Sequence, residues 1–264
     1  MPASAGFRLA RAGVTFAGRA ALAGVDLEIR PGESLALVGP SGSGKTTLLR
    51  LLNAAVLPSS GTVEIDGRSL DGIAPGALRD LRARIGFVHQ DLCLVPNVRV
   101  LSNVLAGKLG QQGFSAALRT LLLPPRAEIE AVARVLERVG IGEKLFQRTD
   151  SLSGGQRQRV ALARALFQEP RALLADEPVS AVDPARARNM VELLAGVSRE
   201  RGLTLVVSLH DITLAREFFP RLVGLREGRV AFDRRTSAVG ADELERLYAL
   251  EGLELADDGR DGAG

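Results

Sequence analysis

The sequence Ser34-Leu35-Ala36-Leu37-Val38, followed directly by Gly39-Pro40-Ser41-Gly42-Ser43-Gly44-Lys45-Thr46, decides the fold class of this chain. The first five residues are nearly all apolar, as in a buried parallel strand. The next eight match the complete glycine-rich pattern of a phosphate-binding loop, and residues 46–54 read as the helix that must follow it. The alternative is a plain glycine- and serine-rich turn, and the complete pattern in this strand–helix context argues against it.

The loop predicts a nucleotide that is bound with a metal ion. Its glycines let backbone N–H groups converge on phosphate oxygens, and the helix N-terminus adds partial positive charge. Lys45 is one of three lysines in a chain that otherwise uses arginine, and a compact ammonium fits among phosphate oxygens better than a guanidinium. We expect Lys45 to reach the β- and γ-phosphates and the Thr46 hydroxyl to ligate Mg²⁺. The expected phosphate cradle comprises Gly39, Pro40, Ser41, Gly42, Ser43, Gly44, Lys45, Thr46 and Thr47.

A second apolar run, residues 172–175, ends in the adjacent acids Asp176 and Glu177. Buried charges are costly unless they are paired or bound to a metal, so this position predicts a cation. We expect Asp176 to hold Mg²⁺ through its water shell and Glu177 to orient and polarise the attacking water. Pro178 is predicted to restrict Glu177 to an extended backbone. Taken alone, the two acids could also mark a strand that runs out into a polar loop.

The run Leu152-Ser153-Gly154-Gly155-Gln156 is a second glycine-rich phosphate-binding signal. One loop is enough to cradle a nucleotide, so a second one predicts a nucleotide gripped from two sides and therefore a dimer. Ser153 and the N–H groups of Gly154 and Gly155, at the start of a helix, make an anion cup suited to a γ-phosphate. A helix-capping serine would explain Ser153 but not the paired glycines.

Taken in chain order, Gly39–Thr46, Leu152–Gln156 and Asp176-Glu177 resemble the motifs of the ATP-binding cassette (ABC) ATPases, and the resemblance covers the chain up to about Gly252. The resemblance implies an α/β P-loop NTPase fold with a mostly parallel core sheet, an N-terminal antiparallel β subdomain, and a helical subdomain inserted at roughly residues 91–165. It implies ATP and Mg²⁺ as cofactors. It also implies a head-to-tail dimer in which residues 152–156 of one chain, Gln156 included, cap the ATP held by the other.

The resemblance assigns further residues one at a time. Gln90 matches the glutamine that senses the γ-phosphate and Mg²⁺, and His210 matches the switch histidine at the γ-phosphate. Phe16 stands where a tyrosine often stacks on adenine, although it could equally be a core residue. Ser180-Ala181-Val182-Asp183 resembles the loop that touches the opposite cassette, with valine where leucine is commoner, and Asp183 is expected near the nucleotide. His89 has no matching role and is interpreted as structural.

Other segments, which are less specific than the three ATP-binding motifs, resemble the ATPase subunits of phosphonate importers. They include Gly86-Phe87-Val88-His89-Gln90, residues 100–110 and Leu209-His210-Asp211, whereas Asp91-Leu92 and Arg234-Arg235 depart from that pattern. The resemblance implies an ATP-hydrolysing subunit that energises phosphonate uptake with two membrane permease subunits and, indirectly, a solute-binding protein. The surface after Gln90, with Leu92, Leu94 and Val95, is expected to hold a short permease helix.

Composition limits the remaining choices. The 264 residues suit one domain over residues 1–255, followed by a tail at 256–264 that we expect to be disordered. A net charge of +3 selects no partner, and aromatic residues at 4% argue against stacking on single-stranded nucleic acid.

Cys93 is the only cysteine, which excludes an intrachain disulfide. Without a signal-peptide pattern or an apolar run near ~20 residues, we expect a peripheral location at the cytoplasmic face of the inner membrane.

Two other functions stay open. One is an ABC ATPase for another solute, such as phosphate, an amino acid or a metal chelate. The other is a soluble ABC ATPase acting on nucleic acid or the ribosome, but such chains usually carry two cassettes, a coiled coil or a zinc insertion, and none is seen here. We therefore expect no nucleic-acid partner. A P-loop kinase does not account for residues 152–156.

Overall fold

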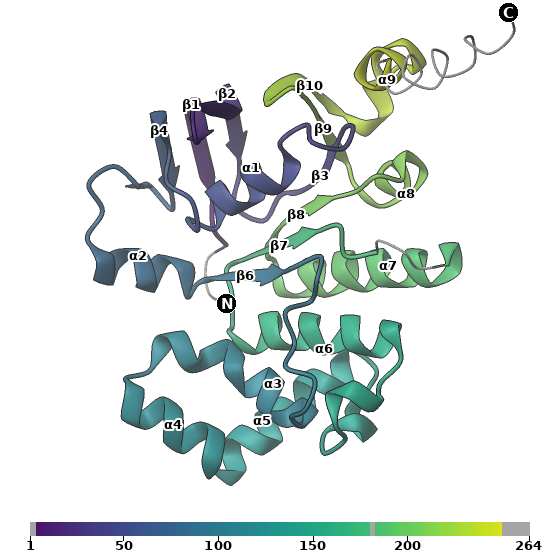
Figure 1. Cartoon of the computed structure of the whole chain (residues 1–264). Coiled ribbons are helices and arrows are strands. Elements are labelled where there is room, and N and C mark those ends of the chain that lie inside the picture. The colour runs from purple at the N-terminus through teal and green to yellow at the C-terminus, as the bar shows by residue number, and fades with distance from the viewer. Residues whose placement is uncertain (1–3, 180–182, 250–264) are drawn as a thin grey trace, which may run out of the picture.

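The computed structural model describes residues 4–179 and 183–249 and builds them into two sheets with surrounding helices (Figure 1). The tail expected to be disordered at 256–264 lies outside these residues. An N-terminal antiparallel sheet has the strand order β2-β1-β4-β5. Its strands are β1 (Phe7–Phe16), β2 (Arg19–Ile29), β4 (Ser60–Ile65) and β5 (Arg68–Ser69).

The second sheet is mostly parallel and carries the predicted motifs. Its order is β10-β9-β3-β8-β7-β6, and only β10 runs antiparallel to its neighbour. The strands are β3 (Ser34–Val38), β6 (Ile85–Val88), β7 (Ala172–Asp176), β8 (Thr204–Ser208), β9 (Arg221–Arg226) and β10 (Arg229–Arg235). Because β3, β8 and β7 are adjacent and parallel, the loops that follow them meet at one edge of the sheet.

The parallel sheet separates two hydrophobic cores. Alternate residues of β3 point to opposite faces, as the two-residue period of a strand requires: Leu35 and Leu37 pack with the antiparallel sheet and α1 (Lys45–Leu52), whereas Ala36 and Val38 pack with helices on the other face. In Figure 1, α1 accordingly lies between the two sheets, and α6 (Gly154–Phe167) and α7 (Pro184–Arg201) lie across the parallel sheet from it.

Between β6 and β7 the chain forms helices and loops without a strand. This lobe contains α3 (Val100–Leu105), η1 (Ala106–Gln111), α4 (Phe114–Leu122), α5 (Arg126–Arg138), η2 (Gly142–Lys144) and η3 (Thr149–Ser151) and leads into α6. The proline- and glycine-flanked sequence of residues 111–125 predicts a loop or irregular helix, but residues 114–122 form a regular α-helix. Ala and Leu favour the helix there, and Pro124 follows its end.

The remaining helices are α2 (Pro75–Arg82), α8 (Ile212–Phe218), η4 (Thr236–Ala238) and α9 (Ala241–Tyr248). Within residues 4–179 and 183–249, none of the helices combines the length and the apolar character that crossing a bilayer requires.

Candidate active site

The loop between β3 and α1 forms one wall of a cavity of about 340 Å³. Its glycines are required by the backbone. Gly39 has φ +146°, and a Cβ on it would overlap the carbonyl oxygen of Leu225; Gly44 has φ +105°, and a Cβ on it would lie 2.9 Å from the carbonyl oxygen of Ala21. The cavity is lined by Ser41, Gly42, Ser43, Gly44, Lys45, Thr46 and Thr47 of the loop, and by Ala20, Ala21, Glu177, Glu227 and Gly228.

Four of these lining residues were missed by sequence reading: Ala20, Ala21, Glu227 and Gly228. The turn at Glu227 and Gly228 packs on the loop, and the Gly228 N–H donates to the carbonyl oxygen of Ser43 at 3.0 Å. The sequence Glu227-Gly228-Arg229 predicts a turn, but no local signal shows that this turn lies against residues nearly 200 positions away.

Lys45 is buried and crosses the inside of the loop. Its Nζ donates to the carbonyl oxygens of Gly39 at 2.8 Å and Pro40 at 3.0 Å. Both carbonyls belong to residues that do not line the cavity. The ammonium is therefore held at the base of the cradle, next to the backbone N–H groups at the start of α1.

Asp176 ends β7 and is buried between two hydroxyl groups. Its Oδ1 accepts from Thr46 Oγ1 at 3.2 Å and from Ser208 Oγ at 2.8 Å. Sequence reading joined Thr46 to Asp176 correctly as neighbours but did not single out Ser208, which ends β8. Only the position of Ser208 at the carboxyl end of a central strand could have pointed to it.

The donor set fits Mg²⁺. A hydroxyl and a carboxylate are hard oxygen ligands, and Mg²⁺ commonly takes only one or two protein ligands and fills its shell with water and phosphate oxygens. Among the described residues, no group of three or more His, Cys, Asp or Glu could hold a metal by itself. A cation at Thr46 and Asp176 would thus be shared with a phosphate-bearing ligand.

Glu177 follows Asp176 and pairs with His210, the Glu177 Oε1 lying 2.6 Å from His210 Nε2. The prediction that Pro178 holds Glu177 extended is wrong, because Glu177 has φ +43°, in the left-handed region. Its N–H donates to Ser208 Oγ at 2.8 Å, and this contact together with the His210 pair outweighs the local steric preference. Glu177 lines the cavity, and the contact with His210 joins the loop after β7 to the loop after β8 there.

The second glycine loop lies away from this cavity. Ser153 begins α6 with a capping box, in which its Oγ accepts from the Gln156 N–H at 3.3 Å and the Gln156 Oε1 accepts from the Ser153 N–H at 3.0 Å. Gly154 and Gly155 have no positive φ, and a Cβ on either would meet nothing within 4 Å. Ser153, Gly155 and Gln156 line a separate hollow of about 250 Å³ beside α7.

Three further predicted residues also lie outside the cavity. Gln90 is exposed and lines a hollow of about 450 Å³ together with Gly154. Phe16 is 47% exposed next to the β1–β2 turn, so the alternative of a core residue is wrong. Asp183 caps α7, accepting from the Arg186 N–H at 3.1 Å; residues 180–182 of its predicted loop lie outside the described residues.

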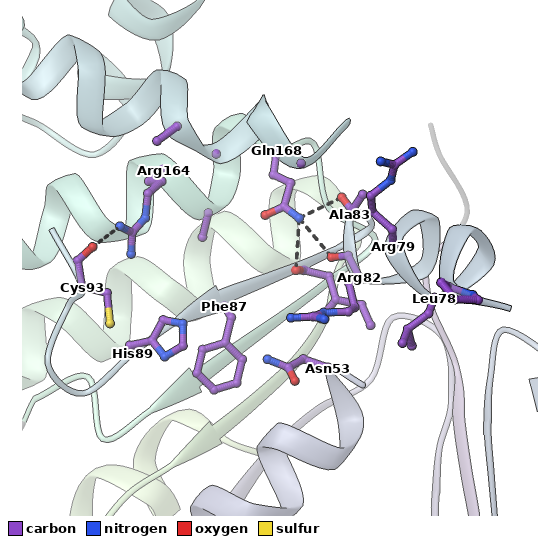
Figure 2. A pocket seen from close by; sticks show the side chains of 16 residues that line it. Asn53, Leu78, Arg79, Arg82, Ala83, Phe87, His89, Cys93, Arg164 and Gln168 are labelled. Carbon is purple, nitrogen blue, oxygen red and sulfur yellow. Dashed lines mark hydrogen bonds between the residues drawn. The ribbon is translucent and has the colours of Figure 1, made fainter. Parts of the chain in front are cut away.

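A larger cavity, about 740 Å³, lies between α2 and β6 on one side and η1 and α6 on the other (Figure 2). His89 lines it with its ring 4.4 Å from that of Phe87, and burial, followed by the nearby Arg164 charge, lowers the pKa of His89. Arg164 of α6 donates to the carbonyl oxygens of Cys93 at 2.5 Å and Leu92 at 2.6 Å. The start of the helical lobe is thus fixed to the helix that begins at the second glycine loop.

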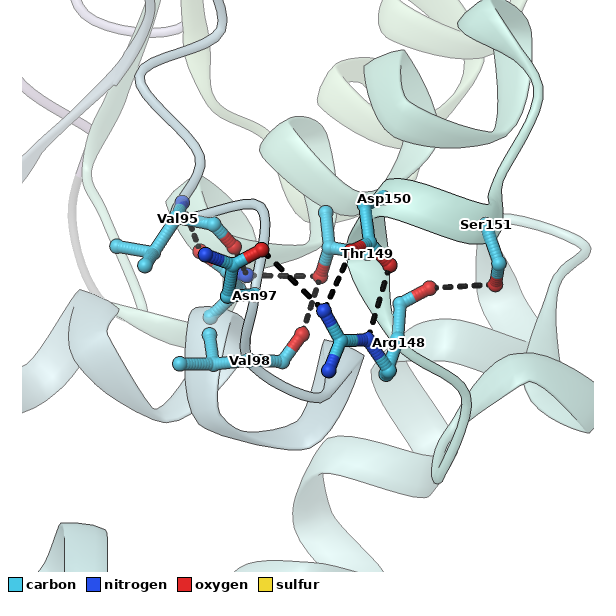
Figure 3. Close-up of polar contacts among 8 residues, drawn as sticks. Val95, Asn97, Val98, Arg148, Thr149, Asp150 and Ser151 are labelled. Carbon is cyan, nitrogen blue, oxygen red and sulfur yellow. Dashed lines mark hydrogen bonds and ion pairs between the residues drawn. The ribbon is translucent and has the colours of Figure 1, made fainter.

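Polar contacts also join the segment after Gln90 to the segment before Leu152 (Figure 3). Buried Asn103 accepts from the Val95 N–H at 2.9 Å and donates both to the Val95 carbonyl at 2.9 Å and to Thr149 Oγ1 at 2.8 Å. Thr149 Oγ1 donates to the Val98 carbonyl oxygen at 3.0 Å, and Arg148 pairs with Asp150 at 2.6 Å. These contacts set the position of the second glycine loop on the lobe.

Comparison with known proteins shows the family to which the chain belongs. Residues 22–180 match the family described as ABC transporter. The chain is 47% identical over 234 residues to the "Phosphonates import ATP-binding protein PhnC" of Pseudomonas fluorescens, covering 89% of this chain and 88% of that protein. The PhnC of Anaeromyxobacter dehalogenans is 50% identical over 228 residues, covering 86% of this chain and 45% of that protein.

Solved structures agree with the architecture. The cbiO1 subunit of the cbiONQ transporter from Clostridium perfringens has a TM-score of 0.76 at 28% identity and covers 94% of this chain and 96% of its own. The dimeric structure of the bacterial cassette MJ0796 has a TM-score of 0.76 at 32% identity, covering 87% of this chain and 98% of its own. With the phosphate-binding loop, the second glycine run and the paired acids in one chain and in this order, the protein belongs to the ABC transporter ATP-binding family.

Proposed function

We propose that this chain is the ATP-hydrolysing subunit of an importer that carries phosphonate across a membrane. The names of its relatives support the cargo, since similar proteins at 44–50% identity are phosphonate import ATP-binding proteins. The chain would work at the cytoplasmic face of the inner membrane, held there by two permease subunits that receive phosphonate from a solute-binding protein. Phosphonate itself would not touch it.

One observation carries the mechanism: the open glycine pair at the start of α6. Neither the backbone conformation of Gly154 and Gly155 nor packing within the chain requires glycine at these positions. Glycine costs helix stability relative to alanine, so a reason outside the chain is needed. Exposed N–H groups at a helix N-terminus bind anions, and the γ-phosphate of an ATP held by a second copy would be that anion. The dimeric cassette MJ0796 supports this arrangement.

Within each cavity, we assign the roles from the contacts described above. Thr46 and Asp176, joined by Gln90 as the lobe closes, would hold Mg²⁺, which supplies charge neutralisation at the phosphates when it is bound. Lys45 would exchange the carbonyl oxygens of Gly39 and Pro40 for phosphate oxygens. Phe16 is free to stack on the adenine, since nearly half of its surface is exposed and the next strand lines the cavity.

Glu177 would accept the proton of the attacking water. Its ion-pair partner His210 holds the carboxylate at the cavity edge and can turn toward the γ-phosphate when the second copy closes. Thr46, Lys45 and His210 then surround the oxygens on which charge builds up. Hydrolysis removes the γ-phosphate that joins the two copies, so the dimer reopens.

The permease contact is expected on the surface of Leu92, Leu94 and Val95 and in the 740 Å³ cavity. Leu92 and Leu94 are half-buried and line the 450 Å³ hollow together with Gln90, and Val95 is exposed. The large cavity is open between the sheet and the lobe, and it is lined by Phe87, His89 and Arg164, which lie close to Gln90 and on α6. A short helix seated in it would touch both parts that move when ATP binds.

The test is complementation between two inactive variants. Lys45→Ala removes the phosphate-binding cation, and Ser153→Arg fills the anion cup with a long side chain. Each variant alone should show background ATP hydrolysis. Mixed in equal amounts, they should recover about a quarter of wild-type activity, because half of the dimers would be mixed and each would hold one intact site of two.

No recovery in the mixture, with both variants folded and Ser153→Arg still binding ATP, would show that the second glycine loop does not act across a dimer. The cargo is tested separately, by reconstituting the chain with its permease and binding protein. Alkylphosphonate should stimulate ATP hydrolysis. If only phosphate, an amino acid or a metal chelate stimulates it, that solute is the cargo and phosphonate is not. Stimulation by DNA or ribosomes without a permease would favour the soluble ABC ATPase.

A further inference from the structure

Helix α4 of the lobe exposes a row of large apolar side chains. Phe114, Leu118 and Leu122 follow one another at four-residue intervals and therefore share one face of the helix; they are 85%, 47% and 69% exposed. We call them the α4 stripe. Leu123, directly after the helix, is exposed as well. Solvent-exposed apolar rows of this size mark a surface that meets a partner.

Packing within the chain covers little of this helix. No residue of α4 is buried, and a helix of nine residues is marginally stable in water without tertiary packing. It is held to the lobe through half-buried Leu121 and by a hydrogen bond from Thr120 Oγ1 to Gln112 Oε1 at 3.0 Å. The proposed nucleotide machinery uses none of these residues.

Charge around the stripe indicates which partner it meets. Residues 92–127 contain no aspartate or glutamate but include Arg99, Lys108, Arg119 and Arg126. Lys108 is paired with Glu169, whereas within the described part of the chain Arg119 on α4 and Arg126 at the start of α5 form no ion pair. An apolar row beside unpaired arginines is the composition of a helix that lies at a membrane interface.

A permease surface fits this charge less well than lipid does. Cytoplasmic loops of membrane proteins carry an excess of lysine and arginine, so they would present like charge to Arg119 and Arg126. The cytoplasmic leaflet is anionic and attracts basic segments near its surface. Helix α4 lies on the lobe (Figure 1) and directly follows η1 in the chain, and Gly107 and Gly110 of η1 line the large cavity, so a partner in that cavity would lie near the stripe.

We infer that α4 lies in the headgroup region of an anionic membrane, with the α4 stripe at the acyl boundary and Arg119 and Arg126 among lipid phosphates. The ATPase would then touch lipid directly, independently of the nucleotide and of the permease. This goes beyond the proposed function and does not require it.

The test is binding of the full chain to vesicles, followed by flotation. Vesicles of equal parts phosphatidylglycerol and phosphatidylcholine should bind the wild type, and pure phosphatidylcholine should bind it weakly. Phe114→Ser/Leu118→Ser/Leu122→Ser should reduce binding at least about tenfold. Arg119→Gln/Arg126→Gln should reduce it about 25-fold, with about fivefold for each arginine, and the loss should shrink as salt rises.

Leu57→Ser/Phe146→Ser is the matched control. Leu57 and Phe146 are 47% and 59% exposed, comparable with the stripe, but lie outside α4, and the variant should bind like the wild type. Circular dichroism and ATP hydrolysis in solution, which should stay unchanged in all variants, separate this inference from failure of the proposed function. Absence of binding to anionic vesicles, or equal loss in the control, overturns the inference. So does a stripe variant that keeps vesicle binding but no longer copurifies with its permease, because the stripe would then be a protein interface.

Discussion

The two glycine loops use glycine for different physical reasons. At Gly39 and Gly44 the backbone has positive φ and neighbouring carbonyls leave no room for a side chain, so glycine maintains the fold. At Gly154 and Gly155 the backbone is helical and the space is open, so glycine maintains access from outside the chain. Substitutions at the two loops should therefore separate stability from activity.

Gly155→Ala should raise the free energy of unfolding by up to ~0.5 kcal/mol, because alanine loses less conformational entropy in a helix. It should also lower ATP hydrolysis at least about tenfold, since the new methyl group stands in the proposed anion cup. Urea unfolding and a steady-state phosphate assay measure the two effects. Gly39→Ala is the contrasting variant and should lose stability and activity together; a Gly155→Ala protein with full activity would contradict the assigned role.

His89 should make stability depend on pH. Burial and Arg164 lower its pKa below 6.5 in the folded chain, so as the pH falls through 6.5 the unfolded chain takes up the proton first. Stability should therefore decrease as the pH falls below 6.5 and level off below the folded pKa. Urea midpoints measured across this range should flatten in His89→Gln. His210→Gln, which removes the only other histidine, should keep the His89 contribution; an unchanged slope in His89→Gln would assign the effect elsewhere.

At the scale of residues, the sequence predicted which side chains would come together better than it predicted their backbone conformation. Lys45, Thr46, Asp176 and Glu177 do come together, because they follow or end β3 and β7, two parallel strands separated only by β8, and so share one edge of the sheet. The backbone of Glu177 could not be predicted, since its conformation is set by Ser208 and His210, which lie more than 30 positions away. The site roles of Gln90 and Asp183 stay predictions.

Among the elements, a helix could be predicted where its own sequence carries capping and terminating residues. The sequence predicts a helix over residues 184–201, and α7 has these bounds. In the structure Asp183 caps this helix, Pro184 is its first residue and Gly202 ends it with φ +64°. Helix α4 lacks such signals: Gly113 precedes it without a side-chain cap, and its apolar face stays unburied. The sequence therefore predicts only a loop or irregular helix at α4, which is the one α-helix within residues 4–179 and 183–249 that has no buried residue.

The Asn103 network should control how firmly the second glycine loop is held. Asn103→Ala leaves the Val95 N–H and carbonyl and the Thr149 hydroxyl without this partner, in a buried place, and should cost about 1–3 kcal/mol of stability. Urea unfolding measures the loss. Exposed Asn97, which accepts from Arg148, is the control, and Asn97→Ala should change stability by less than about 0.5 kcal/mol. If both variants lost the same stability, the Asn103 network would not be what holds the second glycine loop.

For the molecule as a whole, the fold class followed from three motifs, but the surfaces did not. The order of strand, loop and helix around residues 34–54 and 172–201 fixes a parallel sheet, and the observed strand order agrees with it. The large cavity, the hollow beside α7 and the exposed row on α4 each depend on segments brought together from distant parts of the sequence. The periodicity of a sequence shows that a helix or strand has an apolar face, but it does not show which surface that face contacts.

One contact gives the molecule a built-in optical signal. The hydroxyl of Tyr248, in the last described helix, accepts a hydrogen bond at 3.0 Å from the N–H of Gly39, the first residue of the phosphate-binding loop. Tyr248 is the only tyrosine of the chain, and the chain has no tryptophan. Its intrinsic ultraviolet fluorescence therefore comes mainly from a single ring that touches this loop, and nucleotide binding can be followed in the unlabelled native protein with a spectrofluorometer.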